Sequence, residues 1–146
     1  MTQEEKDLLI KDLSARVFYG VKVNIERDYP NNPQVVERVA KDGEIIVDGI
    51  RAYDIYYYKP YLRPMSSMTD SEIDKLFDIL HIDKDGNDED WIKINDAVGI
   101  KFFFPTEKWV ENVAEAYDYL NSIYIDYRGL IPKGLALKAK EGMYKQ

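Results

Sequence analysis

The stretch of sequence that most constrains the fold is residues 35–58, in which short apolar runs alternate with two Asp-Gly pairs. An Asp-Gly pair accepts the positive φ that a tight hairpin turn requires. Runs rich in β-branched and aromatic residues, bounded by such turns, favour strands. The pattern therefore predicts a short antiparallel meander with strands at residues 35–40, 44–47 and 50–58.

A further strand precedes the meander. Valine and isoleucine alternate with polar residues over residues 21–26, which predicts a strand with one buried face. The run DYPNNP at residues 28–33 has the composition of a loop. Pro60 and Pro64 cannot donate a hydrogen bond to a β-ladder, so we expect regular structure to stop there.

Two capping boxes mark the starts of helices. In the S/T-x-x-E pattern, each of the two side chains accepts the other residue's free backbone N–H. The pattern occurs at Thr2 with Glu5 and again at Thr69 with Glu72, and each box is followed by an apolar stripe. A third stripe predicts another helix from about Glu107.

These elements together predict an α+β fold, in which a small antiparallel β-meander packs with about three helices. Residues 91–94 and 99–104 add two more runs with strand character. A chain of 146 residues has the usual length of one domain, and its 45% hydrophobic content is enough for a core. We therefore expect a single α+β domain over residues 1–146.

The composition excludes several classes of site. The chain has no cysteine, and therefore no disulfide, no zinc–thiolate site and no cysteine nucleophile. Its first residues, MTQEEKDLL, lack the basic and apolar regions of a signal peptide. No apolar run approaches the roughly 20 residues of a membrane-spanning helix. We therefore expect a soluble, cytoplasmic protein with no membrane partner.

The net charge of −7 is concentrated in one segment. Residues 69–96 carry ten acidic and three basic side chains, whereas residues 1–68 and 97–146 are close to neutral. An acidic face repels phosphate backbones. The charge distribution therefore disfavours a nucleic-acid partner.

The acidic run HIDKDGNDEDWI at residues 81–92 has the outline of a calcium-binding loop. With Gly86 at the sixth position of an EF-hand loop, the first position falls on His81 and the twelfth on Ile92. An EF-hand requires a carboxylate at the first and a bidentate glutamate at the twelfth. We therefore interpret residues 83–90 as a solvated acidic loop, and we expect no metal site and no cofactor. The sequence does not decide whether the loop attracts a cation weakly.

His81 is the only histidine, and it provides the basis for an alternative interpretation of the protein as an enzyme. A histidine beside carboxylates can act as a general acid or base near neutral pH. At the end of a helix, a histidine also interacts favourably with the helix dipole. The motifs GxGxxG, HExxH, GxSxG and CxxC are absent. We therefore expect no enzymatic activity, with a small carboxylate- and His-based enzyme as the alternative.

The run YDIYYYKPYLRP, from Tyr53 to Pro64, contains five tyrosines and two basic residues, Lys59 and Arg63. Aromatic rings interleaved with basic residues can stack the bases of a single strand, so a single-stranded nucleic-acid binder is the second alternative. Tyrosine is also common in strands, where half of the rings point inward. Clusters of exposed tyrosine and arginine are enriched at protein interfaces. We therefore interpret the run as partly core and partly an exposed interaction surface.

Two segments, YKPYLRPMSSMTDSE (58–72) and DYRGLIPKGLALKAKEGMY (126–144), resemble small uncharacterised proteins in phage-like and mobile-element gene sets of gut bacteria. Those proteins contain a similar Lys-Pro-Tyr-Leu-x-Pro segment before a Ser/Met-rich helix start. A similar Asp-Tyr-Arg-Gly-Leu-Ile segment lies near their C-terminus. The resemblance covers about a quarter of the chain and brings no known activity. It implies an accessory protein of a phage or mobile element.

The most favoured interpretation is a non-enzymatic interaction protein that binds another protein. Both resembling segments place aromatic and basic residues in irregular chain, which is a common location of function. The alternative is a structural role, in which the tyrosines cover sheet edges and the arginines pair with nearby acids. The predicted binding surface consists of Tyr56, Tyr58, Lys59, Tyr61, Arg63, Tyr127 and Arg128.

Overall fold

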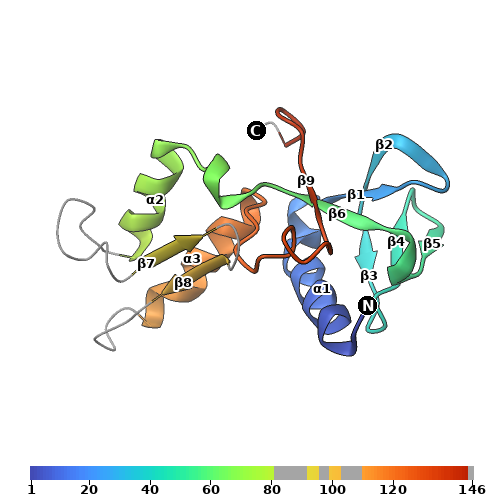
Figure 1. Cartoon of the computed structure of the whole chain (residues 1–146), viewed down its shortest axis with the longest axis horizontal. Helices are drawn as coiled ribbons and strands as arrows, with labels where there is room; N and C mark the ends of the chain where they lie inside the picture. The colour runs from blue at the N-terminus through green and yellow to red at the C-terminus, as the bar shows by residue number, and fades with distance from the viewer. Residues whose placement is uncertain (81–91, 96–98, 103–109, 145–146) are drawn as a thin grey trace. The chain divides into compact units, whose positions relative to one another are not determined.

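Within the part of the chain that it describes, the computed structural model confirms the predicted α+β class (Figure 1). That part contains three α-helices and three β-sheets, of four, three and two strands. None of its helices has the length and apolar character needed to cross a membrane. The described residues are 1–80, 92–95, 99–102 and 110–144.

The chain forms two compact units. The first comprises residues 1–62 and 130–146, and the second comprises residues 63–129. By sequence, the first unit carries 12 acidic and 13 basic side chains and the second carries 15 acidic and 7 basic ones, so their net charges are +1 and −8. The acidity of the protein therefore belongs to the second unit. The expectation of a single domain over the whole chain stays a prediction.

The first helix, α1 (Gln3–Arg16), begins at the predicted capping box. The Glu5 N–H donates to the Thr2 hydroxyl over 3.1 Å, and the Thr2 N–H donates to the Glu5 carboxylate over 3.2 Å. The helix continues into a 3-10 turn, η1 (Val17–Tyr19), and stops at Gly20, whose φ of 79° is left-handed. The predicted helix is confirmed.

An ion pair that the sequence pattern did not indicate lies on the buried face of α1. Asp12 and Arg16 are one helical turn apart, and neither side chain has any exposed surface. Arg16 donates from Nε and Nη2 to the two carboxylate oxygens over 2.9 and 3.1 Å. This two-point geometry offsets part of the cost of removing both charges from water.

The predicted meander is a three-stranded antiparallel sheet with the order β3 (Arg38–Val39), β4 (Ile45–Val47) and β5 (Arg51–Tyr53). Both predicted Asp-Gly turns are present, and their glycines, Gly43 and Gly49, have φ of 90° and 78°. The turns are therefore confirmed. The strands are shorter than the sequence predicted.

The four-stranded sheet has the order β2 (Tyr29–Val35), β1 (Lys22–Ile25), β6 (Lys59–Leu62) and β9 (Leu137–Lys138). β1 confirms the strand predicted over residues 21–26, and it pairs antiparallel with both β2 and β6. β6 and β9 are parallel. Because β9 comes from the far end of the chain, no local sequence pattern indicated this pairing.

Two predictions that depended on proline were wrong. Residues 29–33 lie in β2 rather than in a loop, and Pro60 lies within β6, opposite Val23. β2 is an edge strand, where the missing N–H of a proline removes no internal ladder bond. β9 pairs with β6 only from Tyr61 onward, so Pro60 has a strand partner on one side alone.

Tyr144 holds the C-terminal segment on this sheet. Its hydroxyl accepts a hydrogen bond from the Lys22 N–H over 2.9 Å and donates one to the Tyr61 carbonyl over 2.7 Å. In the antiparallel pairing of β1 with β6, Lys22 comes one residue before Val23, and Tyr61 comes one residue after its partner Pro60. The hydroxyl therefore bridges β1 and β6 at the point where their direct pairing ends.

In the second unit, the other predicted capping box starts α2 (Asp70–Leu80). The Glu72 N–H donates to the Thr69 hydroxyl over 3.2 Å, and the Thr69 N–H donates to the Glu72 carboxylate over 2.9 Å. A 3-10 turn, η3 (Met65–Ser67), precedes the box. The helix predicted at this place is confirmed.

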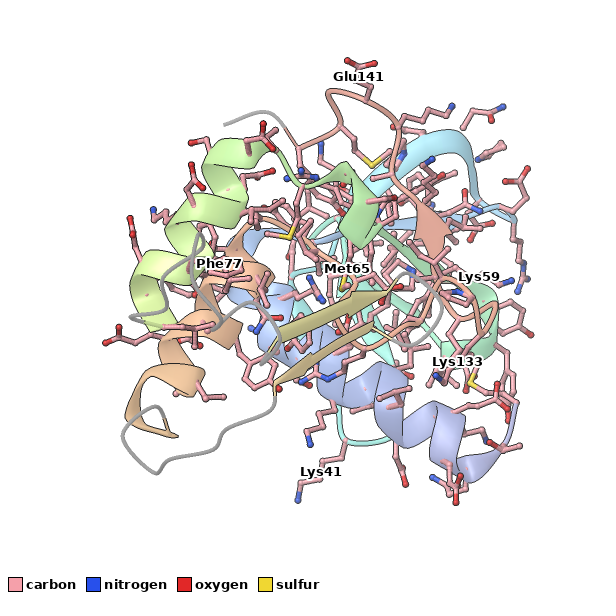
Figure 2. The ribbon with its side chains drawn as sticks, turned by 60° about the vertical axis from the view of Figure 1, so that its left-hand side comes forward. Lys41, Lys59, Met65, Phe77, Lys133 and Glu141 are labelled. Atoms are coloured by element: carbon pink, nitrogen blue, oxygen red, sulfur yellow. The ribbon has the colours of Figure 1, made fainter. Side chains whose placement is uncertain are left out.

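The remaining elements of the second unit are α3 (Val110–Ser122) and the antiparallel pair β7 (Ile92–Asn95) and β8 (Gly99–Phe102). α3 confirms the third predicted helix, although its expected start near Glu107 lies outside the described residues. α2 and α3 share one buried apolar cluster, of which Figure 2 labels two residues. The buried members are Met65, Met68, Leu76, Phe77, Leu80, Ala116, Leu120, Ile123, Ile125 and Tyr127.

Candidate functional site

The structure divides the predicted binding surface between the two units. The first unit contains Tyr56, Tyr58, Lys59 and Tyr61, and the second contains Arg63, Tyr127 and Arg128.

Arg63 is a structural residue of the second unit. Its Nη1 and Nη2 donate to the two carboxylate oxygens of Glu72 over 2.8 and 2.7 Å. Nη2 also donates to the Ser67 carbonyl over 2.9 Å, and Nη1 donates to the Ile123 carbonyl over 3.3 Å. Arg63 therefore ties η3, α2 and the segment after α3 together. The prediction that Arg63 belongs to the binding surface is corrected, because its N–H groups donate to residues of its own unit.

Tyr127 is likewise a core residue, since only 5% of its surface is exposed. Its ring lies 5.0 Å from that of Tyr117, centroid to centroid, within the shared apolar cluster. The guanidinium of the half-buried Arg128 stacks on the same ring at 4.7 Å. The prediction that Tyr127 contributes to an exposed surface was therefore wrong, because the ring fills the core of the unit.

The pair of Arg63 and Glu72 predicts a pH dependence of stability. Hydrogen bonds from Arg63 hold the pKa of Glu72 below its usual value. A lowered folded-state pKa stabilises the protein above the unfolded-state pKa, near 4.5, and that contribution disappears as the pH falls through the lowered pKa. We expect Arg63→Gln to lower the free energy of unfolding by about 1–3 kcal/mol at pH 7, and by less at pH 3.

Urea denaturation at the two pH values measures this difference. The matched control is Arg51→Gln, because Arg51 lies 3.9 Å from Asp28 and is 56% exposed, which makes its ion pair weak. An Arg63→Gln effect that is equal at pH 7 and pH 3 would show that the ion pair does not stabilise the unit.

In the first unit, the tyrosine run leaves the strand conformation and forms a 3-10 turn, η2 (Ile55–Tyr57). The Asp54 carboxylate caps this turn by accepting the Tyr56 N–H over 3.1 Å. Ile55 is 2% exposed and anchors the turn, whereas Tyr56 and Tyr57 are 60% and 50% exposed. A strand would expose alternate residues, but the turn exposes two neighbours. Tyr57 was therefore missed in the predicted surface, and Asp54 at the N-cap was the local signal for it.

Tyr58, unlike Tyr56 and Tyr57, is buried, and it anchors the turn from the interior of the unit. It is 4% exposed, and its hydroxyl donates a hydrogen bond to the Gly43 carbonyl in the turn between β3 and β4. Burial raises the pKa of the Tyr58 hydroxyl, so this group stays a neutral donor. Its predicted role as an exposed ring is corrected, because the ring supports the turn instead.

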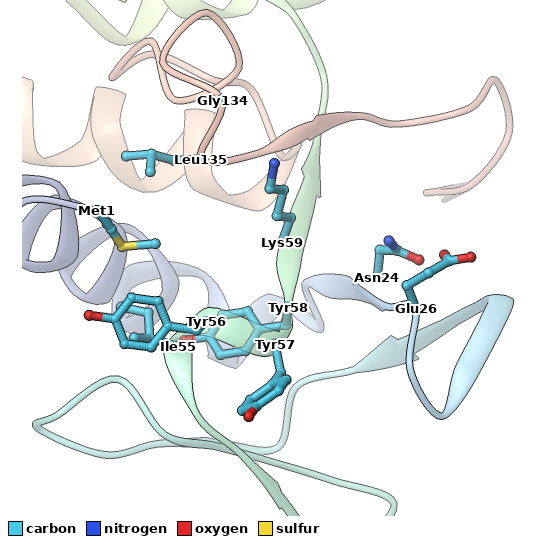
Figure 3. A pocket seen from close by; sticks show the side chains of 10 residues that line it. All are labelled: Met1, Asn24, Glu26, Ile55, Tyr56, Tyr57, Tyr58, Lys59, Gly134 and Leu135. Atoms are coloured by element: carbon cyan, nitrogen blue, oxygen red, sulfur yellow. The ribbon is translucent and has the colours of Figure 1, made fainter.

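A hollow of about 330 Å³ lies beside η2, and we call it the tyrosine hollow (Figure 3). The buried Ile55, Tyr58 and Leu135 give it an apolar floor, and Tyr56 and Tyr57 stand at its edge. Its other lining residues are Met1, Asn24, Glu26, Lys59 and Gly134. Of the predicted surface, Tyr56, Tyr58 and Lys59 are therefore brought together, whereas Tyr61 is not among the lining residues.

A second hollow, of about 460 Å³, shares Tyr57 with the first. It is lined by charged residues of both signs, and the guanidinium of Arg27 lies over the Tyr57 ring at 5.5 Å. The ammonium of Lys6 lies over the Tyr56 ring at 4.7 Å. Cation–π contacts contribute about 0.5–1 kcal/mol each at exposed sites, which favours these orientations of the two rings. The lining residues of the second hollow are Arg27, Asp28, Glu44, Arg51, Ala52, Tyr53, Asp54 and Tyr57.

The two candidate chemical centres of the sequence, His81 and the acidic residues 83–90, lie outside the described residues. Within the described part, no three His, Asp or Glu side chains are grouped so that they could hold a metal ion. The tyrosine hollow offers instead an apolar floor, fixed aromatic rings and a few charged groups, which is a typical composition of a binding site.

Comparisons of the chain with protein-family models, with curated proteins and with solved structures gave no match.

Proposed function

We propose that the protein is a non-enzymatic interaction protein, which binds another protein through the tyrosine hollow. The observation that carries the proposal is the pair of exposed rings on η2, where Tyr56 and Tyr57 stand beside an apolar floor. Tyrosines that combine an apolar ring with a polar tip are enriched at the energetic centres of protein interfaces.

Pre-ordering of the rings supports this function. Asp54 caps the turn, Ile55 anchors it, and Lys6 and Arg27 each lie over one exposed ring. Side chains that are already ordered lose less conformational entropy when a partner binds. A partner can therefore use most of the contact energy of the two rings.

The accessory role in a phage or mobile element is part of this proposal. It is supported by the resemblance of residues 58–72 and 126–144 to proteins of such gene sets. Both segments also contain residues with structural roles, such as Arg63 and Tyr127. A shared fold would explain the resemblance equally well.

The test is site-specific photo-crosslinking in cells that produce the protein. A benzoylphenylalanine at position 57 is expected to crosslink one partner protein reproducibly. The matched control is the same residue at position 18, because Phe18 is 87% exposed and lines neither hollow. The purified partner should then bind Tyr57→Ala about tenfold or more weakly than the parent protein, and Phe18→Ala equally well.

Two results would contradict the proposal. One is the same set of crosslinked proteins from positions 57 and 18, since the hollow would then have no selective partner. The other is an identified partner whose affinity is unchanged by Tyr57→Ala.

A further inference from the structure

Tyr57 lines both hollows, and each hollow also contains a cation that forms no ion pair within the described part of the chain. Arg27 lines the second hollow and Lys59 lines the tyrosine hollow. Within the described part of the chain, neither side chain forms an ion pair with a carboxylate. An arginine that stacks on an aromatic ring keeps its planar N–H fork available for a carboxylate. Arg27 is held in this arrangement by its contact with the Tyr57 ring.

Asp28 and Asp54, which line the second hollow together with Arg27, have contacts elsewhere in the unit. Asp28 accepts a hydrogen bond from the Tyr53 hydroxyl over 2.6 Å and lies 3.9 Å from Arg51. Asp54 caps the N–H of Tyr56. Within the described residues, neither of these carboxylates forms an ion pair with Arg27.

The remaining acids limit which anion can bind. Glu26 lines the tyrosine hollow and Glu44 lines the second hollow, and both residues are exposed. A continuous polyanion such as a nucleic-acid strand would place phosphates near both carboxylates, which disfavours it. A single carboxylate brings only one negative charge near these acids, so the repulsion is smaller.

We infer that the ligand of the tyrosine hollow is an extended peptide segment of a partner protein, in which an apolar side chain lies next to an acidic one. The apolar side chain enters the hollow over Ile55 and Leu135, and the carboxylate binds the Arg27 guanidinium that lies over the Tyr57 ring. This inference rests on the proposed function and names the chemistry of its partner. Exposed charge pairs of this kind set specificity and the rate of association more than the affinity.

The experiment selects short random peptides displayed on phage against the purified protein. The selected peptides are expected to carry Asp or Glu within about two positions of a large apolar residue, because alternate side chains of an extended segment share one face. Fluorescence anisotropy of the labelled peptides then gives their affinities. Arg27→Gln is expected to weaken binding about fivefold to tenfold, and Tyr57→Ala about tenfold or more.

The matched control for charge is Arg38→Gln, because Arg38 is exposed on β3 and lines neither hollow. It should leave the affinity within about twofold of the parent value, as expected for a charge outside the contact. An effect of Arg38→Gln equal to that of Arg27→Gln would reduce the Arg27 effect to net charge and overturn the inference.

The remaining outcomes separate the inference from the proposed function. Selected peptides that depend on Tyr57 but lack an acidic residue, or that bind Arg27→Gln normally, overturn the inference and leave the proposed function standing. If no selected peptide depends on Tyr57, both fail. Both also fail if a single-stranded oligothymidylate of about 20 nucleotides binds more tightly than the peptides and loses affinity with Tyr57→Ala. An Arg27-dependent dimer in sedimentation would make the partner a second copy and overturn the inference.

Discussion

Asp12→Asn is expected to lower the free energy of unfolding by about 3–5 kcal/mol, which makes it the most destabilising substitution that the structure identifies. The Asp12 and Arg16 side chains are both fully buried on α1 and share two hydrogen bonds. The amide that replaces the carboxylate keeps the shape but removes the charge. Arg16 would then lose the carboxylate to which it donates two hydrogen bonds inside the protein. Urea denaturation followed by circular dichroism measures the loss.

The same helix supplies a matched control. Asp7 accepts a hydrogen bond from Gln3 over 2.8 Å, also one turn away, but both residues are exposed. Asp7→Asn should therefore change the free energy of unfolding by about 0.5 kcal/mol or less. If Asp12→Asn is equally mild, the buried pair does not have the energetic role assigned to it.

A double substitution tests whether the loss arises from breaking the charge pair. Asp12→Leu combined with Arg16→Met removes both charges and keeps similar apolar volume. Replacement of a buried ion pair by apolar residues is often neutral or stabilising, so the double variant should be more stable than Asp12→Asn. A double variant as unstable as Asp12→Asn would assign the loss to packing.

Gly43→Ala is expected to have the second largest effect, a loss of about 2–5 kcal/mol. Gly43 has φ of 90°, which costs an alanine about 1–2 kcal/mol. An added Cβ would also lie 2.8 Å from Cδ1 of Ile55 and 3.2 Å from Cγ1 of Ile10. Overpacking of this kind costs a further ~1–3 kcal/mol, which is similar to the cost of the backbone strain.

Gly49→Ala separates the two contributions. Gly49 has φ of 78°, but no heavy atom lies within 4 Å of the position of its Cβ. Gly49→Ala should therefore lower the free energy of unfolding only by the cost of the backbone strain, about 1–2 kcal/mol. Thermal or urea denaturation of both variants gives the difference, and equal losses would contradict a packing role for Gly43.

The Gly43 substitution also connects stability with the proposed function. Ile55 begins η2, and the Tyr58 hydroxyl donates to the Gly43 carbonyl. A shift of Gly43 therefore moves the turn that presents Tyr56 and Tyr57. Under conditions where both variants are folded, Gly43→Ala should weaken partner binding, whereas Gly49→Ala should not.

The sequence predicted the helix starts and the hairpin turns, because neighbouring residues determine both. The capping boxes at Thr2 and Thr69 and the turns at Gly43 and Gly49 are where the sequence placed them. These features depend on residues within four positions of one another, so a single sequence contains their full cause. The α+β class followed from the same signals.

The candidate site could be predicted only in part. The tyrosine run was singled out by composition, but the choice among its rings assumed a strand that continues to residue 58. The chain instead turns at η2, which exposes Tyr56 and Tyr57 and buries Tyr58. Asp54 caps the turn locally, but the direction of the Tyr58 ring depends on a partner fifteen residues away, the Gly43 carbonyl.

The amino-acid sequence by itself determined the helix starts, the hairpin turns and the segregation of negative charge, because each arises from neighbouring residues or from simple counting. Only the tertiary structure decided that Arg63 binds Glu72, that Tyr127 fills a core and that Asp12 and Arg16 are buried together. A charged or aromatic side chain is compatible with both surface and interior. Its environment depends on which distant segments pack around it, and that information is not present in any local window of the chain.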